Sequence, residues 1–243
     1  MISNLNNELS TRVSTLDIEQ LQGAFIAQDE FVQVENFLPP SLAREMLDTL
    51  PSLETLVHRN YIPGHKKGGS IGRFEIDSAT PLFSKLYKSP ALIEFLERLC
   101  GNDLIVCPSR DQHSYALYYY TEPGDHIGYH YDTSYYKGTR YTVLIGLVSA
   151  PSCLLQYQLH TRNPKQEMET SNLELQTGTL VFFNGDKLRH RITPLGANER
   201  RVALTLEFLT NAGMHPLMRF VSNMKDAIAY FGFKQVFKGP RQG

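Results

Sequence analysis

Between residues 104 and 209 the sequence is a succession of short apolar or alternating segments that are separated by turn residues. Many short strands with Gly, Pro and Asn turns between them are typical of a sandwich or a barrel. We predict an α+β fold whose core is a double-stranded β-helix of the jelly-roll, cupin-like type. The expected strands are residues 104–108, 113–120, 127–132, 141–149, 153–160, 171–176, 179–184, 189–193 and 201–209.

Helical patterns precede this β-rich region. Residues 14–17 resemble a capping box, and apolar residues at helical spacing follow them. Residues 31–34 alternate like a strand, and Pro39-Pro40 separates them from a second amphipathic helix. Two more helices are predicted after Thr80-Pro81 and Ser89-Pro90, because each pair places a capping residue before a proline.

Two further segments lie outside these elements. Residues 57–75 contain several glycines and a proline, and we predict a mobile loop that covers a site. Apolar residues in 217–231 have helical spacing and predict a C-terminal helix. We expect a single domain over 1–243, made of a flexible arm (1–13), an N-terminal support with the mobile loop (14–103), the jelly-roll core (104–210) and the C-terminal helix and tail (211–243).

Composition narrows the function classes. The 24 Lys and Arg nearly balance the 25 Asp and Glu, and no charged block appears, so we expect neither nucleic acid nor a membrane as partner. No apolar run is long enough to cross a membrane, and the N-terminal residues lack the apolar core of a signal peptide. The three cysteines show no C-x-x-C spacing, which suits a reducing cytoplasm. We expect a cytoplasmic protein, and a homodimer stays open.

A His-x-Asp triplet ends one of the predicted strands. Residues two apart on a strand point to the same face, so His130 and Asp132 present an imidazole and a carboxylate side by side. Two histidines and one carboxylate with the other positions open are the ligands of non-haem Fe(II) oxygenases. His190 opens a later strand and is our candidate for the second histidine. A His-x-Asp triplet alone is more often without a metal, so the surrounding sequence decides.

An arginine pair lies near the start of the strand that follows His190. A guanidinium inside a barrel needs an anion, because a buried unpaired charge is very costly, and its planar fork suits a carboxylate. Arg201 and Arg200 are the two candidates for this role.

In their order, these motifs resemble the Fe(II)- and 2-oxoglutarate-dependent oxygenases over roughly residues 30–210. The order is more specific than any single motif. The resemblance implies an iron enzyme with 2-oxoglutarate and O2 as cosubstrates. The matching text is H-Y-D at 130–132 with its approach from Tyr120, G-T-L-V-F-F-N-G at 178–185, H-R-I-T-P-L-G at 190–196 and E-R-R-V-A-L-T at 199–205.

Residue roles follow from this resemblance by position. The resemblance implies that His130, Asp132 and His190 bind Fe(II) and that Arg201 holds the distal carboxylate of 2-oxoglutarate. Arg201 is preferred to Arg200 because it shares strand parity with small residues further along, as is usual in the family.

A narrower resemblance concerns residues 130–147 and 220–232, which are similar to a small group of enzymes acting on free amino acids. That group contains hydroxylases and carrier-independent halogenases, and in the halogenases a glycine replaces the carboxylate ligand to leave room for chloride. Asp132 fills that position here, so the resemblance implies a hydroxylase acting on an unactivated C–H bond of a free amino acid or an amino-acid-derived metabolite. Desaturation and ring formation use the same oxidant and stay open.

A free amino acid needs partners for its carboxylate and its amine. Arg73 is our candidate for the carboxylate, with a surface pairing to Glu75 or Asp77 as the alternative. Thr205 and Glu207 share the strand parity of Arg201, so both are expected to face the pocket. Glu207 is the candidate partner of the ammonium group, with a solvent-facing strand end as the alternative.

His126 has the strand parity of His130 and is a candidate for the substrate side of the pocket, or else a satisfied polar residue at the barrel mouth.

Two other function classes stay open. A cupin-like metal-binding isomerase or ligand-binding protein needs the histidines but no arginine for 2-oxoglutarate. An oxygenase of the same fold acting on a protein or nucleic-acid side group needs an open groove, and the balanced charge disfavours nucleic acid.

Overall fold

The computed structural model describes residues 4–133 and 136–213, and most of its strands belong to the β-rich region. The strands are β1 (Phe31–Val34), β2 (His58–Ile62), β3 (Lys66–Gly72), β4 (Ile105–Val106), β5 (Tyr115–Tyr120), β6 (His126–His130), β7 (Arg140–Val148), β8 (Leu155–Leu159), β9 (Glu169–Leu173), β10 (Leu180–Asn184), β11 (Arg189–Ile192) and β12 (Arg201–Leu209). Each expected strand of the core is therefore confirmed, with ends that shift by a few residues.

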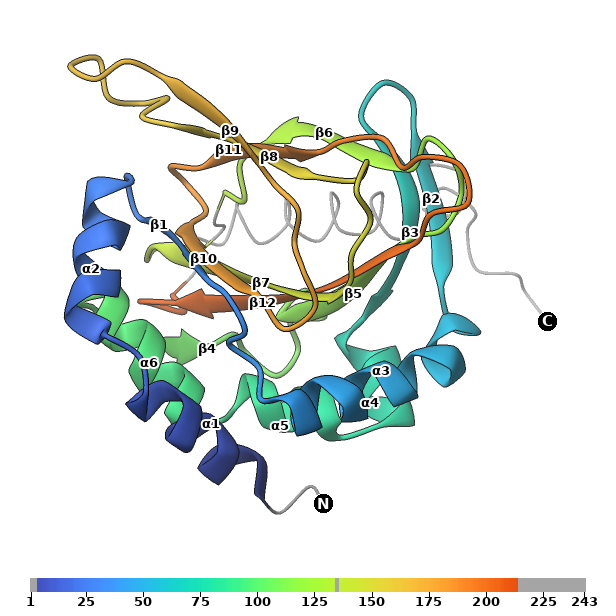
Figure 1. Ribbon diagram of the computed structural model, residues 1–243, viewed down its shortest axis with the longest axis horizontal. Helices are drawn as coiled ribbons and strands as arrows, with labels where there is room; N and C mark the ends of the chain where they lie inside the picture. Colours follow the sequence, from blue (N-terminus) through green and yellow to red (C-terminus); the bar gives the residue numbers. More distant parts are fainter. Residues whose placement is uncertain (1–3, 134–135, 214–243) are drawn as a thin grey trace.

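The sheet is antiparallel and curls over a hollow. Its strand order is β1-β10-β7-β12-β5-β3-β6-β11-β8-β9, with β2 beside β3 and β4 beside β12. One layer contains β10, β7, β12 and β5, and the second layer, with β6, β11, β8 and β9, faces it (Figure 1). This arrangement is the predicted double-stranded β-helix, with β3 joining the two layers along one side.

Helices cover the outer face of the layer that contains β12 (Figure 1). They are α1 (Leu5–Ser14), α2 (Ile18–Ala27), α3 (Pro40–Glu54), α4 (Arg73–Ala79), α5 (Leu82–Tyr87) and α6 (Pro90–Cys100). The Asp17 side chain accepts a hydrogen bond from the Gln20 backbone N–H and caps α2, and Gly101 ends α6 in the left-handed region with φ 66°. Apart from α1 and α4, these helices are those that the sequence predicts.

Alternation along β12 assigns its side chains to two environments. Val202 and Leu204 belong to the core between the sheet and the helices. Arg201, Thr205 and Glu207 point the other way and line the hollow between the layers. Because side chains on a strand alternate, one strand supplies both the apolar core and the polar wall of a pocket.

The N-terminal segment differs from the prediction. Residues 5–14 form α1 instead of a flexible arm, and Leu5 and Leu9 are buried in the main core. The Arg12 side chain also donates hydrogen bonds to the backbone carbonyls of Glu35 and Asn36. The segment is mainly polar, but it contains a short apolar stripe. This stripe is sufficient to pack the helix against the rest of the core.

The glycine-rich segment 57–75 is also not the mobile loop that the sequence predicts. It forms the β2–β3 hairpin, and α4 begins at Arg73. A Cβ atom at Gly69 would lie 2.4 Å from Cγ1 of Val57, so the glycine permits close packing. The predicted helix over 217–231 lies outside the described residues. Within the described ranges, no helix has the length and apolar character that crossing a bilayer requires.

Candidate metal centre

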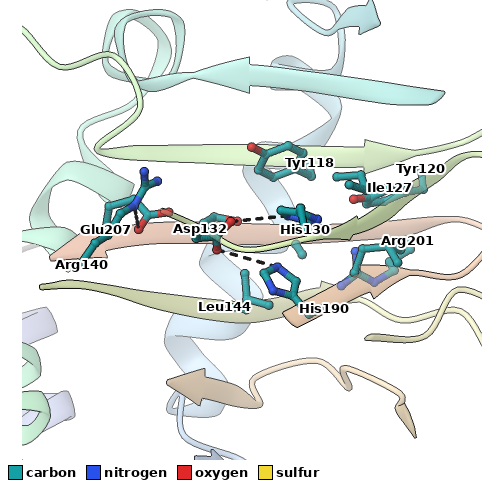
Figure 2. A pocket seen from close by; sticks show the side chains of 13 residues that line it. Tyr118, Tyr120, Ile127, His130, Asp132, Arg140, Leu144, His190, Arg201 and Glu207 are labelled. Carbon is teal, nitrogen blue, oxygen red and sulfur yellow. Dashed lines mark hydrogen bonds and ion pairs between the residues drawn. The ribbon is translucent and has the colours of Figure 1, made fainter. Parts of the chain in front are cut away.

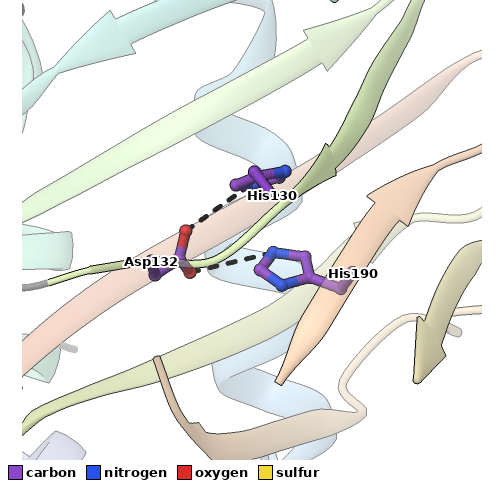
Figure 3. A group of neighbouring side chains, drawn as sticks. All are labelled: His130, Asp132 and His190. Atoms are coloured by element: carbon purple, nitrogen blue, oxygen red, sulfur yellow. Dashed lines mark ion pairs between the residues drawn. The ribbon is translucent and has the colours of Figure 1, made fainter. Parts of the chain in front are cut away.

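The three predicted ligands converge between β6 and β11. His130 and His190 are opposite each other in the register of these two strands, and Asp132 follows His130 by two residues. The ligand atoms of the three side chains all lie within 4.8 Å of one another (Figure 3). Nε2 of His130 lies 3.4 Å from Oδ1 of Asp132, and Nε2 of His190 lies 3.8 Å from Oδ2. Two imidazoles and one carboxylate therefore surround one point, as an Fe(II) ion requires.

Backbone carbonyls orient both imidazoles. Nδ1 of His130 lies 2.8 Å from the carbonyl oxygen of Gly128, and Nδ1 of His190 lies 3.3 Å from that of Leu188. When Nδ1 carries the proton and donates to a carbonyl, Nε2 keeps its lone pair for a metal. This arrangement directs both Nε2 atoms to the ligand position.

Electrostatics favour the ligand forms of Asp132 and His190, whereas His130 holds its proton more readily while no cation is bound. Burial works to raise the pKa of Asp132, but the neighbouring His190 and His130 hold it well below its ordinary value. Burial and the nearby His130 lower the pKa of His190 to about 4. Burial opposes the charged form of His130, yet the hydrogen bond with Asp132 outweighs it and raises the pKa. A carboxylate beside a neutral imidazole is the state in which these groups bind a cation.

The metal ligands open into a cavity of about 90 Å³ between the two layers. Figure 2 shows Asp132, His130 and His190 in its middle, Arg201 on one side and Arg140 with Glu207 on the other. The cavity therefore has an arginine at each end with the metal site between them, and one of the two arginines is paired with a glutamate.

Arg201 is a buried guanidinium with no acidic partner among the described residues. It is 2% exposed, and its guanidinium carbon lies 5.1 Å from the ring centre of Tyr120. Its Nε makes no hydrogen bond within the part of the chain that the structure describes. Arg200 directly precedes β12 and does not line the cavity, and its Nη2 lies 3.0 Å from a carboxylate oxygen of Glu54. A buried charge in this state fits an anionic ligand, so the cavity suits the distal carboxylate of 2-oxoglutarate.

Two of the predicted substrate residues, Thr205 and Glu207, line the cavity. Glu207 already has a cationic neighbour, because Nε of Arg140 donates to its Oε2 at 2.6 Å. Burial raises the pKa of Glu207 to about 7, although Arg140 works in the opposite direction.

The other two predicted substrate residues are not among those that line the cavity. Arg73 is buried on α4, where it contacts Asp77 at 3.4 Å and Ser114 at 3.3 Å. The pairing with Asp77 was the alternative interpretation, and it joins the buried Arg73 to an exposed carboxylate on the same helix. Nδ1 of His126 lies 2.8 Å from the carbonyl oxygen of Gly124, as in a satisfied polar residue. We carry neither residue into the proposal.

Sequence reasoning missed Arg140. It is the first residue of β7 and lines the same cavity as Arg201, which is the first residue of β12. An arginine at the start of a predicted strand was the signal that singled out Arg201. Arg140 directly precedes the predicted strand 141–149, so a similar signal is present there.

Asp125 explains part of the motif that leads to His130. Its side chain is fully buried and accepts hydrogen bonds from both terminal nitrogens of Arg59, at 2.7 and 2.8 Å. The backbone N–H groups of Thr121 and Glu122 also donate to it, at 2.9 and 3.0 Å. Asp125 therefore closes the turn between β5 and β6 and fixes the start of the strand that carries the first metal ligand.

Comparisons with solved structures agree with this fold. The non-haem alpha-ketoglutarate-dependent carbocyclase SnoK from nogalamycin biosynthesis has a TM-score of 0.66 at 14% identity, over 86% of this chain and 92% of that chain. The epimerase SnoN from the same biosynthesis has a TM-score of 0.65 at 16% identity, over 79% and 81% of the two chains. A prolyl hydroxylase of Trichoplax adhaerens, in complex with a hypoxia inducible factor peptide fragment, has a TM-score of 0.62 at 15% identity, over 88% and 95%. At these identities the likeness shows a common fold.

A comparison with curated proteins found no match. A family model described as Halogenase D (HalD) matches residues 13–226, which is most of the chain. The chain therefore belongs to the Halogenase D family, among the Fe(II)- and 2-oxoglutarate-dependent oxygenases.

Proposed function

We propose that this protein is a dioxygenase that uses Fe(II) and 2-oxoglutarate to hydroxylate an unactivated C–H bond of a small molecule, a free amino acid or a metabolite derived from one. The observation that carries the proposal is the buried guanidinium of Arg201, which has no acidic partner among the described residues, in the cavity that contains the three ligands. A cupin-like isomerase or ligand-binding protein needs a metal site but has no use for a buried arginine without an anion.

The residues of the site have separate tasks in this reaction. His130, Asp132 and His190 would hold the iron, and Arg201 would hold the distal carboxylate of 2-oxoglutarate. When bound, iron, 2-oxoglutarate and O2 supply the oxidising power, with succinate and CO2 as the other products. The chain positions the reactants and excludes water from them. The side chains of Ile127, Leu144 and Ile192 form an apolar part of the cavity wall.

The family name makes halogenation the rival reaction. Asp132 lies with both histidines around the metal position, so a carboxylate occupies the place that a halide would need. This supports hydroxylation over halogenation. Mass spectrometry of the product, formed in buffer with chloride, separates the two reactions. We expect a gain of one oxygen atom, and a chlorinated product would contradict the proposal.

The first test needs no knowledge of the substrate. Fe(II) and then 2-oxoglutarate are added to metal-free protein under anaerobic conditions, and the visible spectrum is recorded. We expect a weak charge-transfer band that requires both additions. Arg201→Gln should lose the band at a 2-oxoglutarate concentration that saturates the original protein. The matched control Arg200→Gln should keep it, because Arg200 pairs with Glu54 outside the cavity.

A folded protein that binds the metal but shows no such band would contradict the oxygenase proposal. A band of unchanged strength in Arg201→Gln would contradict the assignment of Arg201 alone.

A further inference from the structure

Arg140 and Glu207 form a pair of opposite charges at the end of the cavity away from Arg201 (Figure 2). They project from the neighbouring strands β7 and β12. The side chain of Glu207 is 5% exposed and that of Arg140 is 20% exposed, so the pair is largely removed from water. Desolvating two charges is expensive, and a buried ion pair is weak evidence of a role in stability alone.

Each member of the pair keeps unused hydrogen-bonding groups. Arg140 uses Nε to contact Glu207, and neither of its terminal nitrogens makes a hydrogen bond to any described residue. Glu207 uses Oε2 for Arg140 and for the hydroxyl of Thr142, whereas Oε1 makes no hydrogen bond within the described ranges. A guanidinium has five N–H donors and a carboxylate has two acceptor oxygens, so both can take a further partner.

The pair lies one side chain away from the metal site. The hydroxyl of Thr142 is 3.0 Å from Oδ2 of Asp132 and 3.0 Å from Oε2 of Glu207. The metal ligands separate this end of the cavity from the end with Arg201 (Figure 2). With 2-oxoglutarate held at the Arg201 end, a small molecule held by Arg140 and Glu207 would place its next carbon atoms beside the metal.

We propose that Arg140 and Glu207 bind the head group of a zwitterionic α-amino acid. The terminal nitrogens of Arg140 take the α-carboxylate, and Oε1 of Glu207 takes the α-ammonium. Adjacent charges of opposite sign in the cavity match the adjacent charges of that head group. A dicarboxylic or neutral substrate would leave Glu207 without a function. This inference rests on the proposed function and gives Arg140 the role that the sequence assigned to Arg73.

The experiment uses the full chain with Fe(II) and 2-oxoglutarate under anaerobic conditions. The twenty standard L-amino acids are added one at a time, and the shift of the charge-transfer band reports binding. The amino acid that binds most tightly is then compared with its primary amide and with its α-hydroxy acid. We expect each analogue to bind roughly 10- to 100-fold more weakly, because each loses one charge-assisted contact.

Variants assign each contact to one residue. Arg140→Gln should remove the preference for the acid over the amide, and Glu207→Gln should remove the preference for the amine over the hydroxyl. Arg73→Gln is the matched control, since Arg73 is buried beside Asp77 and should leave both preferences unchanged. Arg140→Gln that keeps the preference for the acid would overturn the inference. So would an original protein whose band none of the twenty amino acids shifts.

Arg140→Gln leaves Glu207 buried without its cation, which can itself unfold the protein. The double variant Arg140→Gln/Glu207→Gln keeps a neutral hydrogen-bonding pair of similar shape and should lose both preferences together. The charge-transfer band shows in each variant that iron and 2-oxoglutarate still bind. If the original protein shows no charge-transfer band, the proposed function is contradicted. If the band is present but the variants keep the same preferences for acid and amine, only this inference is contradicted.

Discussion

The two ends of the cavity contain arginines that differ in their partners. Arg201 and Arg140 are both the first residues of their strands, β12 and β7, and both line the same cavity. Arg140 contacts Glu207 at 2.6 Å, whereas Nε of Arg201 has no partner within the described part of the chain. The end with a single charge suits a carboxylate, and the end with two charges suits a zwitterion. The acidic neighbour therefore distinguishes a cosubstrate site from a substrate site.

The largest effect is expected at the metal site between the two ends. Asp132→Ala should lower the coupled formation of succinate and hydroxylated product by more than about 100-fold, because changes in the outer shell alone already reduce metal affinity or activity by that order. Succinate release measures the loss. Removal of iron from the original protein with a chelator should cause a similar loss of activity. Added Fe(II) should then restore the activity of the original protein but should not restore that of Asp132→Ala. Substantial succinate release by the variant would contradict the assignment of Asp132.

Exchanging the two arginines for glutamine in turn tests the comparison directly. Arg201→Gln should raise the 2-oxoglutarate concentration for half-maximal activity by roughly 10- to 100-fold, because a charge-assisted pair is lost. Arg140→Gln should leave that concentration nearly unchanged and should raise the half-saturating amino acid concentration instead. Initial rates at varied concentrations of each compound separate the two effects. If both variants impaired both compounds equally, the cavity would not have two distinct ends.

A third arginine, Arg59, forms an ion pair that stabilises the fold and does not line the cavity. It holds the fully buried Asp125 through both terminal nitrogens, while its own side chain is one-third exposed. Asp125→Asn should lower the free energy of unfolding by about 2 kcal/mol, since hydrogen bonds to a charged group are weakened. Denaturation in urea measures this change. The affinity for 2-oxoglutarate in the folded variant should stay within a few-fold of the original, and a selective loss of that affinity would contradict the structural role.

The same pair predicts a dependence on pH. Burial works to raise the pKa of Asp125, but the hydrogen bonds from Arg59 and two backbone N–H groups hold it below the ordinary value. The folded state therefore binds this proton less readily than the unfolded state does. The contribution of Asp125 is present above the ordinary carboxyl pKa of about 4 and is lost as the pH falls through the lower folded value. Asp125→Asn should lose stability less steeply in this acidic range.

The smallest effect is expected at the hydroxyl that joins the substrate end to the metal. Thr142→Val keeps the shape of the side chain and removes its contacts with Asp132 and Glu207. We expect the turnover number to fall about 3- to 10-fold, because one net hydrogen bond is lost. The 2-oxoglutarate dependence should not change. Steady-state kinetics check this expectation, and an unaltered turnover number would show that the two sites act independently.

Prediction from the sequence worked best where periodicity along one strand decides the outcome. His130 and Asp132 lie two residues apart, and Arg201, Thr205 and Glu207 share one face of β12. It failed where a short segment takes its structure from distant partners. Helix α1 forms from a mainly polar stretch because Leu5 and Leu9 find an apolar core that is built by later residues.

The sequence by itself determined the strands, the faces of those strands and the order of the metal-binding motifs, because these depend on local backbone geometry. Only the tertiary structure decided which polar and charged side chains contact each other. Arg140 and Glu207 lie 67 residues apart in the chain and meet because β7 pairs with β12 in one register. Arg73 meets Ser114, which lies 41 residues away, for the same kind of reason, outside the cavity. Register and closure of a curled sheet depend on the packing of the whole chain, so no single segment specifies them.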